Sequence, residues 1–198
     1  VASILEKKYR VLKTEGNRNT RIGLALTLLG YQDEECIVVE VGMNQRGEIS
    51  TLSQMARPDV AIITNIGTSH IGNLGSRENI LKAKLEILDG LTGPIIVNND
   101  NDLLHEWAMK EQKQEVITFG IDEESLYQAK EVFYSLKGST FTINDTKFLL
   151  PVFSKAFIYN ALVAYIIGHM FGVENEQISQ VFQEIKPEAH RMEKIDDH

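Results

Sequence analysis

Residues 58–88 constrain the fold more than any other stretch, because they combine a short apolar run, a polar loop and a helix. Val60–Ile63 is a run of consecutive apolar residues, which is typical of a strand buried on both faces of a parallel sheet. The run ends at Thr64 and Asn65, and His70 follows in the loop. Ligands bind at the carboxyl ends of strands in open parallel α/β sheets, so this order predicts a site there.

The helix after this loop carries a lysine among apolar residues. Ser76 is the predicted N-cap. At about 100° per residue, Ile80, Ala83 and Ile87 share one face, and Lys84 falls near its centre. Burying an ammonium group is costly, so a buried lysine tends to lose its proton and become a nucleophile. The pattern leaves a second interpretation open, in which Lys84 extends its amine to the surface.

Strand and helix patterns alternate up to about residue 120, which predicts an α/β fold with a mainly parallel sheet flanked by helices. The expected strands cover 9–14, 36–41, 60–63, 94–98 and 115–119, and the other expected helices cover 20–29, 48–56 and 102–113. After Leu126 the pattern changes. Runs over 127–136, 139–143 and 147–152 are joined by short polar turns, which predict antiparallel hairpins.

Helices are expected over 155–171 and 175–185, and the first of them is apolar almost all round, so it should be buried. We expect residues 1–198 to form one domain, with 126–152 as a small antiparallel β extension.

Charge and composition exclude some classes of function. The net charge of −8 argues against a general nucleic-acid binder, which is usually basic. Cys36 is the single cysteine, which excludes an internal disulfide and suits a reducing compartment such as the cytoplasm. No apolar run is long enough to predict membrane insertion.

Three polar residues near strand ends are candidates for a site. Glu40 ends an apolar run, where a carboxylate can hold a hydrated magnesium ion beside nucleotide phosphates, or can simply face water. His70 and Asn65 follow the next strand. Each also has an ordinary explanation, His70 as a surface residue and Asn65 as a turn former.

Several segments, in this order along the chain, resemble the central ATP-binding domain of the Mur ligases, which has a P-loop-NTPase-like fold. These are TEGNRNTRIG (14–23), VEVGMNQRGEI (39–49), ARPDVAIITNIGTSHIGNLGS (56–76), ILKAKLEIL (80–88) and HRMEKI (190–195). Within the family they are most similar to the ligases that add D-alanyl-D-alanine to UDP-N-acetylmuramoyl-tripeptide in peptidoglycan synthesis.

The resemblance implies an ATP-dependent amide ligase with Mg²⁺. A substrate carboxylate would attack the γ-phosphate of ATP, and the amine of D-alanyl-D-alanine would then displace phosphate from the acyl phosphate. The resemblance implies that Glu40, His70 and Lys84 are the catalytic and metal-binding residues, with Lys84 carbamylated. A carbamate is an anionic oxygen ligand suited to magnesium.

The resemblance also implies binding residues. Asn160, Arg191 and Asn65 would bind the nucleotide, Asn98 and Asp100 would lie near it, and Asn17 and Asn19 would face the UDP-N-acetylmuramoyl-tripeptide. Ala156 and Phe157 stand where the family usually has a histidine-asparagine pair, and Thr20 replaces the second asparagine of another pair. The first departure removes the residues expected to stack on adenine, and the second changes one of the residues expected to face the substrate.

The Gly-Lys-Thr or Gly-Lys-Ser phosphate loop of the family does not occur in this sequence. The family's amino-terminal domain, which grips the UDP-sugar, and its carboxy-terminal domain, which brings the dipeptide, are also expected to be missing from this chain. We therefore expect this chain alone to have no ligase turnover and weak nucleotide binding at best. We expect the protein to be a monomer. Alternatives are another Mur ligase, a folylpolyglutamate synthase, or a non-catalytic nucleotide-binding module.

Overall fold

The computed structural model describes residues 1–135 and 137–185, so Arg191 and segment 190–195 lie outside the described residues. The helices are α1 (Ala2–Leu5), α2 (Arg21–Leu29), α3 (Glu48–Ala56), α4 (Ile71–Leu74), α5 (Arg77–Leu85), the 3₁₀ helix η1 (Glu86–Asp89), α6 (Asp102–Lys110), α7 (Lys155–Met170) and α8 (Asn175–Gln183). The strands are β1 (Val11–Lys13), β2 (Cys36–Val38), β3 (Ala61–Ile63), β4 (Ile95–Asn98), β5 (Val116–Gly120), β6 (Tyr127–Gln128), β7 (Lys130–Ser135), β8 (Gly138–Ile143) and β9 (Thr146–Leu150).

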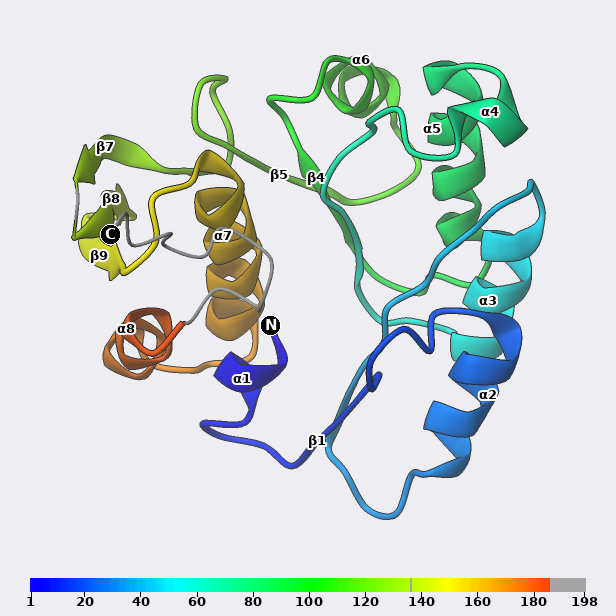
Figure 1. Ribbon diagram of the computed structural model, residues 1–198, viewed down its shortest axis with the longest axis horizontal. Coiled ribbons are helices and arrows are strands. Elements are labelled where there is room, and N and C mark those ends of the chain that lie inside the picture. The colour runs from blue at the N-terminus through cyan, green and yellow to red at the C-terminus, as the bar shows by residue number, and fades with distance from the viewer. Residues whose placement is uncertain (136, 186–198) are drawn as a thin grey trace, which may run out of the picture.

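Parallel strands form the centre of the molecule, as the sequence predicts. The order β3-β4-β5-β6 is parallel throughout, and β1 and β2 form a second parallel pair. Helices α2, α3 and α5 lie on one side of these strands, and α7 lies on the other (Figure 1). Because both faces are covered, the strands can be apolar throughout, and Ile95, Ile96 and Val97 are each 0% exposed.

Two clusters of buried apolar side chains lie on the two faces of the sheet, and β4 contributes to both. Ile95 and Val97 belong to the cluster with Leu52 and Ile80 from α3 and α5. Ile96 belongs to the other cluster, which includes Tyr165 of α7. Successive side chains of a strand point to opposite faces, so one short strand supplies both cores.

Helix α7 is buried, as predicted from its apolar sequence, and residues 161–168 are all buried. It separates the parallel strands from the antiparallel sheet of order β7-β8-β9 (Figure 1). The predicted turn between β8 and β9 is confirmed, with Asn144 at φ 45° and Asp145 at φ 61°. Ser76 caps α5 as predicted, since its Oγ accepts the Asn79 N–H at 3.3 Å.

Several details differ from the prediction, among them the following. Tyr127 and Gln128 were expected in an antiparallel hairpin but pair in parallel with β5, so the hairpins begin only at Lys130. Strand β2 ends at Val38, which places Glu40 beyond the strand in the following loop. Helix α4 was not predicted, because it is only four residues long. The helix predicted through residue 88 is α-helical only to Leu85 and continues as the 3₁₀ helix η1. None of the helices within the described ranges is long and apolar enough to cross a membrane.

Candidate functional site at the carboxyl edge of the parallel sheet

The loop after β3 begins with Asn65 and Ile66, and a lysine from α5 reaches it. The Lys84 amine donates to the Asn65 carbonyl oxygen at 2.7 Å. The side chain is partly buried, and burial lowers the pKa of Lys84. The amine therefore contacts the loop after β3 through an exposed hydrogen bond, and its side chain is only partly buried.

Asn101 holds the same loop from the N-terminus of α6. Its Nδ2 donates to the Asn65 Oδ1 at 2.9 Å and to the Ile66 carbonyl at 3.2 Å. Its Oδ1 accepts the Leu104 N–H at 3.2 Å, so Asn101 is also the N-cap of α6. Asn101 is not among the site residues predicted from the sequence. An asparagine directly before a helix was the available signal, but it indicates a cap and not a long-range partner.

Arg77 is a second residue at this edge that was not predicted from the sequence. Its Nη2 donates to the Ile66 carbonyl at 3.1 Å. Its guanidinium also forms a two-pronged ion pair with Asp102, with distances of 2.9 and 2.5 Å. Arg77 is the first residue of α5 and Asp102 the first of α6, so the pair fixes the two helix starts against the β3 loop.

His70 lies farther along the same loop and is exposed. It has φ 66° and is the residue before α4. The backbone N–H groups of Asn44 and Gln45 lower the pKa of Glu48, and the charges of Arg21 and His70 contribute in the same direction.

Glu40 is exposed and is anchored by residues before α2. Asn19 donates its Nδ2 to Glu40 Oε1 at 3.3 Å, and the Glu40 N–H donates to Thr14 Oγ1 at 3.1 Å. The Asn19 carbonyl also accepts the Gly42 N–H at 2.9 Å. Asn19 therefore positions Glu40 and the loop after it. The second carboxylate oxygen of Glu40 accepts no hydrogen bond from any described residue.

Glu86 connects the Lys84 helix to the Glu40 loop and was also missed. Both of its oxygens accept the Gly47 N–H, at 2.9 and 2.8 Å, and one accepts the Ser50 N–H at 3.4 Å. Gly47 is the N-cap of α3 with φ 85°. Its backbone needs glycine, and it offers no side chain for capping. Glu86 therefore supplies the cap from another element.

A second group of polar residues lies at the start of α7. Asp100 accepts the N–H groups of Ile121 and Glu123, each at 2.7 Å, and the Tyr159 hydroxyl at 2.7 Å. Burial alone would raise the pKa of Asp100, but these donors outweigh it and lower the pKa. Burial and the Asp100 carboxylate raise the pKa of Tyr159 to about 12. Asn160 follows Tyr159 on α7 and is exposed.

The structure does not gather all the predicted ligands into one cluster. No three histidine, cysteine or acidic side chains converge to hold a metal ion in residues 1–135 and 137–185. Asn17 is exposed, and its carbonyl accepts the Asn19 N–H at 2.8 Å. Asn98 Oδ1 accepts the Asp100 N–H at 3.0 Å, so Asn98 stabilises the turn that positions Asp100.

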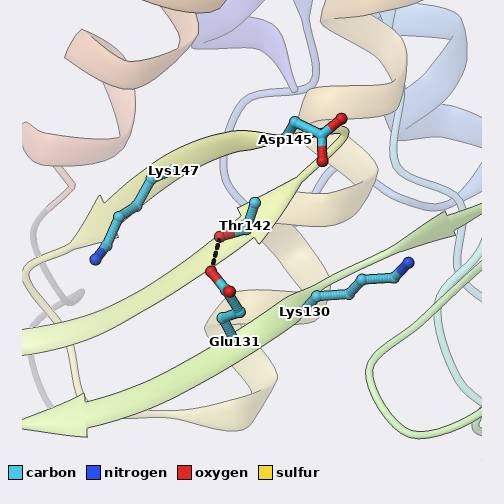
Figure 2. A pocket seen from close by; sticks show the side chains of 5 residues that line it. All are labelled: Lys130, Glu131, Thr142, Asp145 and Lys147. Carbon is cyan, nitrogen blue, oxygen red and sulfur yellow. Dashed lines mark hydrogen bonds between the residues drawn. The ribbon is translucent and has the colours of Figure 1, made fainter.

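A surface hollow on the antiparallel sheet lies apart from this edge. It is lined by Lys130, Glu131, Thr142, Asp145 and Lys147. Lys130 and Lys147 each pair with Thr142 across the strands, but their ammonium groups point away from each other (Figure 2). The two cations therefore do not converge on one anion, and we assign no role to this hollow.

Comparison with known proteins gives consistent matches. Residues 1–168 match the Mur ligase middle domain. A UDP-N-acetylmuramoyl-tripeptide–D-alanyl-D-alanine ligase of Bacillus subtilis is 40% identical over 200 residues, which is 98% of this chain and 43% of that protein. The MurF crystal structure I from Acinetobacter baumannii superposes with a TM-score of 0.89 at 29% identity, covering 99% of this chain and 44% of that chain.

The MurF ligase of Thermotoga maritima in complex with ADP superposes with a TM-score of 0.80 at 26% identity. That match covers 93% of this chain and 44% of the Thermotoga chain. The chain thus spans less than half the length of each of these three relatives.

Proposed function

Because the chain belongs to the Mur ligase family, we propose that it is the central nucleotide-binding domain of an ATP-dependent ligase that joins D-alanyl-D-alanine to UDP-N-acetylmuramoyl-tripeptide. The observation that carries this proposal is the Lys84 amine, partly buried and bound to the Asn65 carbonyl at the sheet edge. Glu40 lies in the loop that follows β2, and His70 lies in the loop that follows β3.

The chemical difficulty of such a reaction is charge, since an anionic carboxylate must approach an anionic phosphate. The substrate carboxylate attacks the γ-phosphorus of ATP, and the bond to ADP breaks. The dipeptide amine then attacks the acyl carbon, phosphate leaves, and the amine loses a proton. Groups that offset negative charge at the transferring phosphoryl group lower both barriers.

Lys84 is proposed to act as a carbamate. Its neutral amine attacks the carbon of CO₂, one C–O π pair moves onto oxygen, and the nitrogen releases a proton to solvent. The lowered pKa of Lys84 supports this step, because a larger fraction of the amine is neutral at a given pH. The product replaces a cation by an anionic oxygen ligand.

The residues at this edge fit magnesium. Mg²⁺ usually keeps several waters and takes one or two carboxylates together with substrate phosphates, so a dense cluster of protein ligands is not required. Glu40, with one oxygen held by Asn19, would hold one ion, and His70 and carbamylated Lys84 would hold the second. Imidazole suits Mg²⁺ less well than carboxylate does, so the carbamate would contribute more. Bound magnesium would screen the repulsion between carboxylate and phosphate.

Asn160 and Asn65 are proposed to contact the nucleotide, and Asn17 and Asn19 the UDP-N-acetylmuramoyl-tripeptide. Both Asn160 and Asn65 are exposed, which supports a role in binding. Arg191, the remaining predicted nucleotide contact, lies outside the described residues. The Asn19 contact to Glu40 gives it a positioning role in addition to the substrate contact.

The test is turnover by the full-length protein. ADP release is measured with ATP and Mg²⁺, and with the UDP-muramoyl-tripeptide and D-alanyl-D-alanine added singly and together. Release that requires both substrates supports the proposal. Release that instead requires a folate and glutamate would assign the chain to a different ligase, and nucleotide binding without any turnover would favour a non-catalytic module.

A further inference from the structure

The hydrogen bonds of Asn101 determine which way its amide group faces. The Leu104 N–H can only donate, so the Asn101 atom that meets it at 3.2 Å is the oxygen. The Asn101 NH₂ therefore faces the opposite way, toward the β3 loop. The Ile66 carbonyl on that side can only accept, at 3.2 Å, which independently requires the same orientation.

The orientation of Asn101 in turn determines that of Asn65. Asn101 presents a donor, and the Asn65 atom that it meets at 2.9 Å must be an acceptor, which is Oδ1. Asn101 is only 8% exposed, so water cannot readily replace these partners. The Leu104 N–H and the Ile66 carbonyl thus orient Asn101, and Asn101 in turn orients the side-chain amide of Asn65.

The Asn65 NH₂ is the group left facing outward. Asn65 is exposed, and its Nδ2 donates to no described residue. The group lies over Gly67, where the Cβ of any larger residue would come within 3.4 Å of it. We infer that Asn65 presents a hydrogen-bond donor to an anionic oxygen of the bound reactants, and that Asn101 is the positioning residue that imposes this orientation.

The ligand class follows from the donor. An NH₂ group cannot coordinate a cation, so this side chain does not serve as a magnesium ligand. Given the proposed function, on which this choice of ligand rests, the oxygen belongs to a nucleotide phosphate or to the carbamate of Lys84. The Lys84 amine lies 2.7 Å from the Asn65 backbone carbonyl oxygen, so a carbamate on Lys84 would be close to this residue. The phosphate alternative follows from the proposed function alone.

Two substitutions in the full-length enzyme distinguish loss of the outward NH₂ donor from loss of the local structure. Asn65→Asp keeps an oxygen for Asn101 but replaces the outward NH₂ by a second oxygen. Asn101→Asp keeps the oxygen that caps α6 but removes the donor to Asn65, so Asn65 can turn its oxygen outward. We expect kcat/KM to fall about 100-fold for Asn65→Asp, as when a donor to a developing anion is removed. For Asn101→Asp we expect about a tenfold fall.

The matched control is Asn175→Asp. Asn175 is the first residue of α8, away from the sheet edge, and the substitution removes the hydrogen bond that its Nδ2 donates to Thr146 Oγ1. It should leave kcat/KM within about twofold of the wild-type value, as expected for a site outside the reaction. Calorimetry with Mg-ADP distinguishes the two sources of the oxygen. Weaker Mg-ADP binding by Asn65→Asp assigns a phosphate, whereas unchanged binding with a raised bicarbonate requirement assigns the carbamate.

The orientation itself has a readout that does not depend on ligase activity. Nuclear Overhauser effects from the Asn65 side-chain NH₂ protons are expected to reach Gly67 in the wild-type enzyme and to move toward residue 101 in Asn101→Asp. NH₂ protons that contact Asn101 in the wild type would overturn the inference, as would wild-type Mg-ADP binding and turnover in Asn65→Asp. A wild-type enzyme without ligase turnover but with the Gly67 contact would refute only the proposed function.

Discussion

Glu86 and Gly47 are 39 positions apart in the sequence, yet both carboxylate oxygens of Glu86 lie within 2.9 Å of the Gly47 nitrogen. Glu86 follows Lys84 by two residues, and Gly47 begins α3 at the end of the Glu40 loop. The short segment from Lys84 to Glu86 therefore contacts both loops. Lys84 donates to the loop after β3, and Glu86 caps α3 at the end of the loop after β2.

Replacing Glu86 by alanine should loosen α3. The Gly47 and Ser50 N–H groups would lose their acceptor, and loss of a helix cap costs about 1 kcal/mol. Hydrogen exchange at the first amides of α3 should speed up, while α8 stays protected. Glu106→Ala on the exposed face of α6 is the control, since it removes only the exposed ion pair to Lys110. Equal exchange at α3 in both variants would show that Glu86 does not cap this helix.

Lys84→Ala in the full-length enzyme should abolish most ligase turnover. The variant cannot form the carbamate, and the loss of a charge-stabilising group typically costs about 100-fold or more in kcat. Added short carboxylates should restore part of the rate by supplying an anionic oxygen in the vacated space. Lys84→Arg should also be inactive, because a guanidinium stays charged and cannot take up CO₂. Full activity of Lys84→Ala would end the assignment.

Ligase turnover should rise with pH where CO₂ is limiting. Burial lowers the pKa of Lys84, so the neutral amine that takes up CO₂ becomes available below the usual range for lysine. Added bicarbonate should move this rising limb toward lower pH. If added bicarbonate does not shift the rising part of the pH–rate profile, the titration belongs to another group. In Lys84→Ala rescued by a carboxylate the limb should be absent.

The same lowered pKa predicts a dependence of stability on pH. Between the folded-state pKa of Lys84 and its ordinary value of 10.5, the unfolded chain binds more protons than the folded chain. The free energy of unfolding should therefore increase with pH across that interval. Lys84→Met keeps an apolar chain of similar length without a charge, so it should flatten this part of the profile. Urea unfolding at a series of pH values measures the difference.

Asp100→Asn should destabilise the turn after β5. The carboxylate accepts several backbone N–H groups and the Tyr159 hydroxyl, and hydrogen bonds to a charged group contribute about 2 kcal/mol. Because the pKa of Asp100 is lowered, its contribution should be complete above the ordinary value of 3.8 and be lost as pH falls through the folded-state pKa. Thermal unfolding at neutral and acidic pH measures both effects. Asp122→Asn, at an exposed position of the same turn, should show the smaller loss.

The sequence predicted the regular elements because their signals are local. The apolar runs of β3 and β4 and the uniformly apolar α7 each indicate an element buried on all sides, and the packing of the structure confirms this. The short helix α4 and the pairing of β6 were missed, since segments of two to four residues are too short to show a period.

The candidate site was predicted only in part for a related reason. Lys84 stands out by contrast with its apolar neighbours, and Glu40 and His70 by their place after strands. Arg77, Asn101 and Glu86 look like ordinary helix-terminal polar residues, and their partners are 11 to 39 positions away. Nothing in local spacing indicates which distant carbonyl or N–H group such a side chain will bind.

Strand β4 has a mechanical consequence for the molecule. Ile95 and Val97 anchor one layer of helices, while Ile96 between them anchors the other. A sliding or hinging of one layer against the other would have to twist this single buried ribbon. The two layers are therefore joined through β4, and we expect any opening that admits reactants to involve the loops at the strand ends.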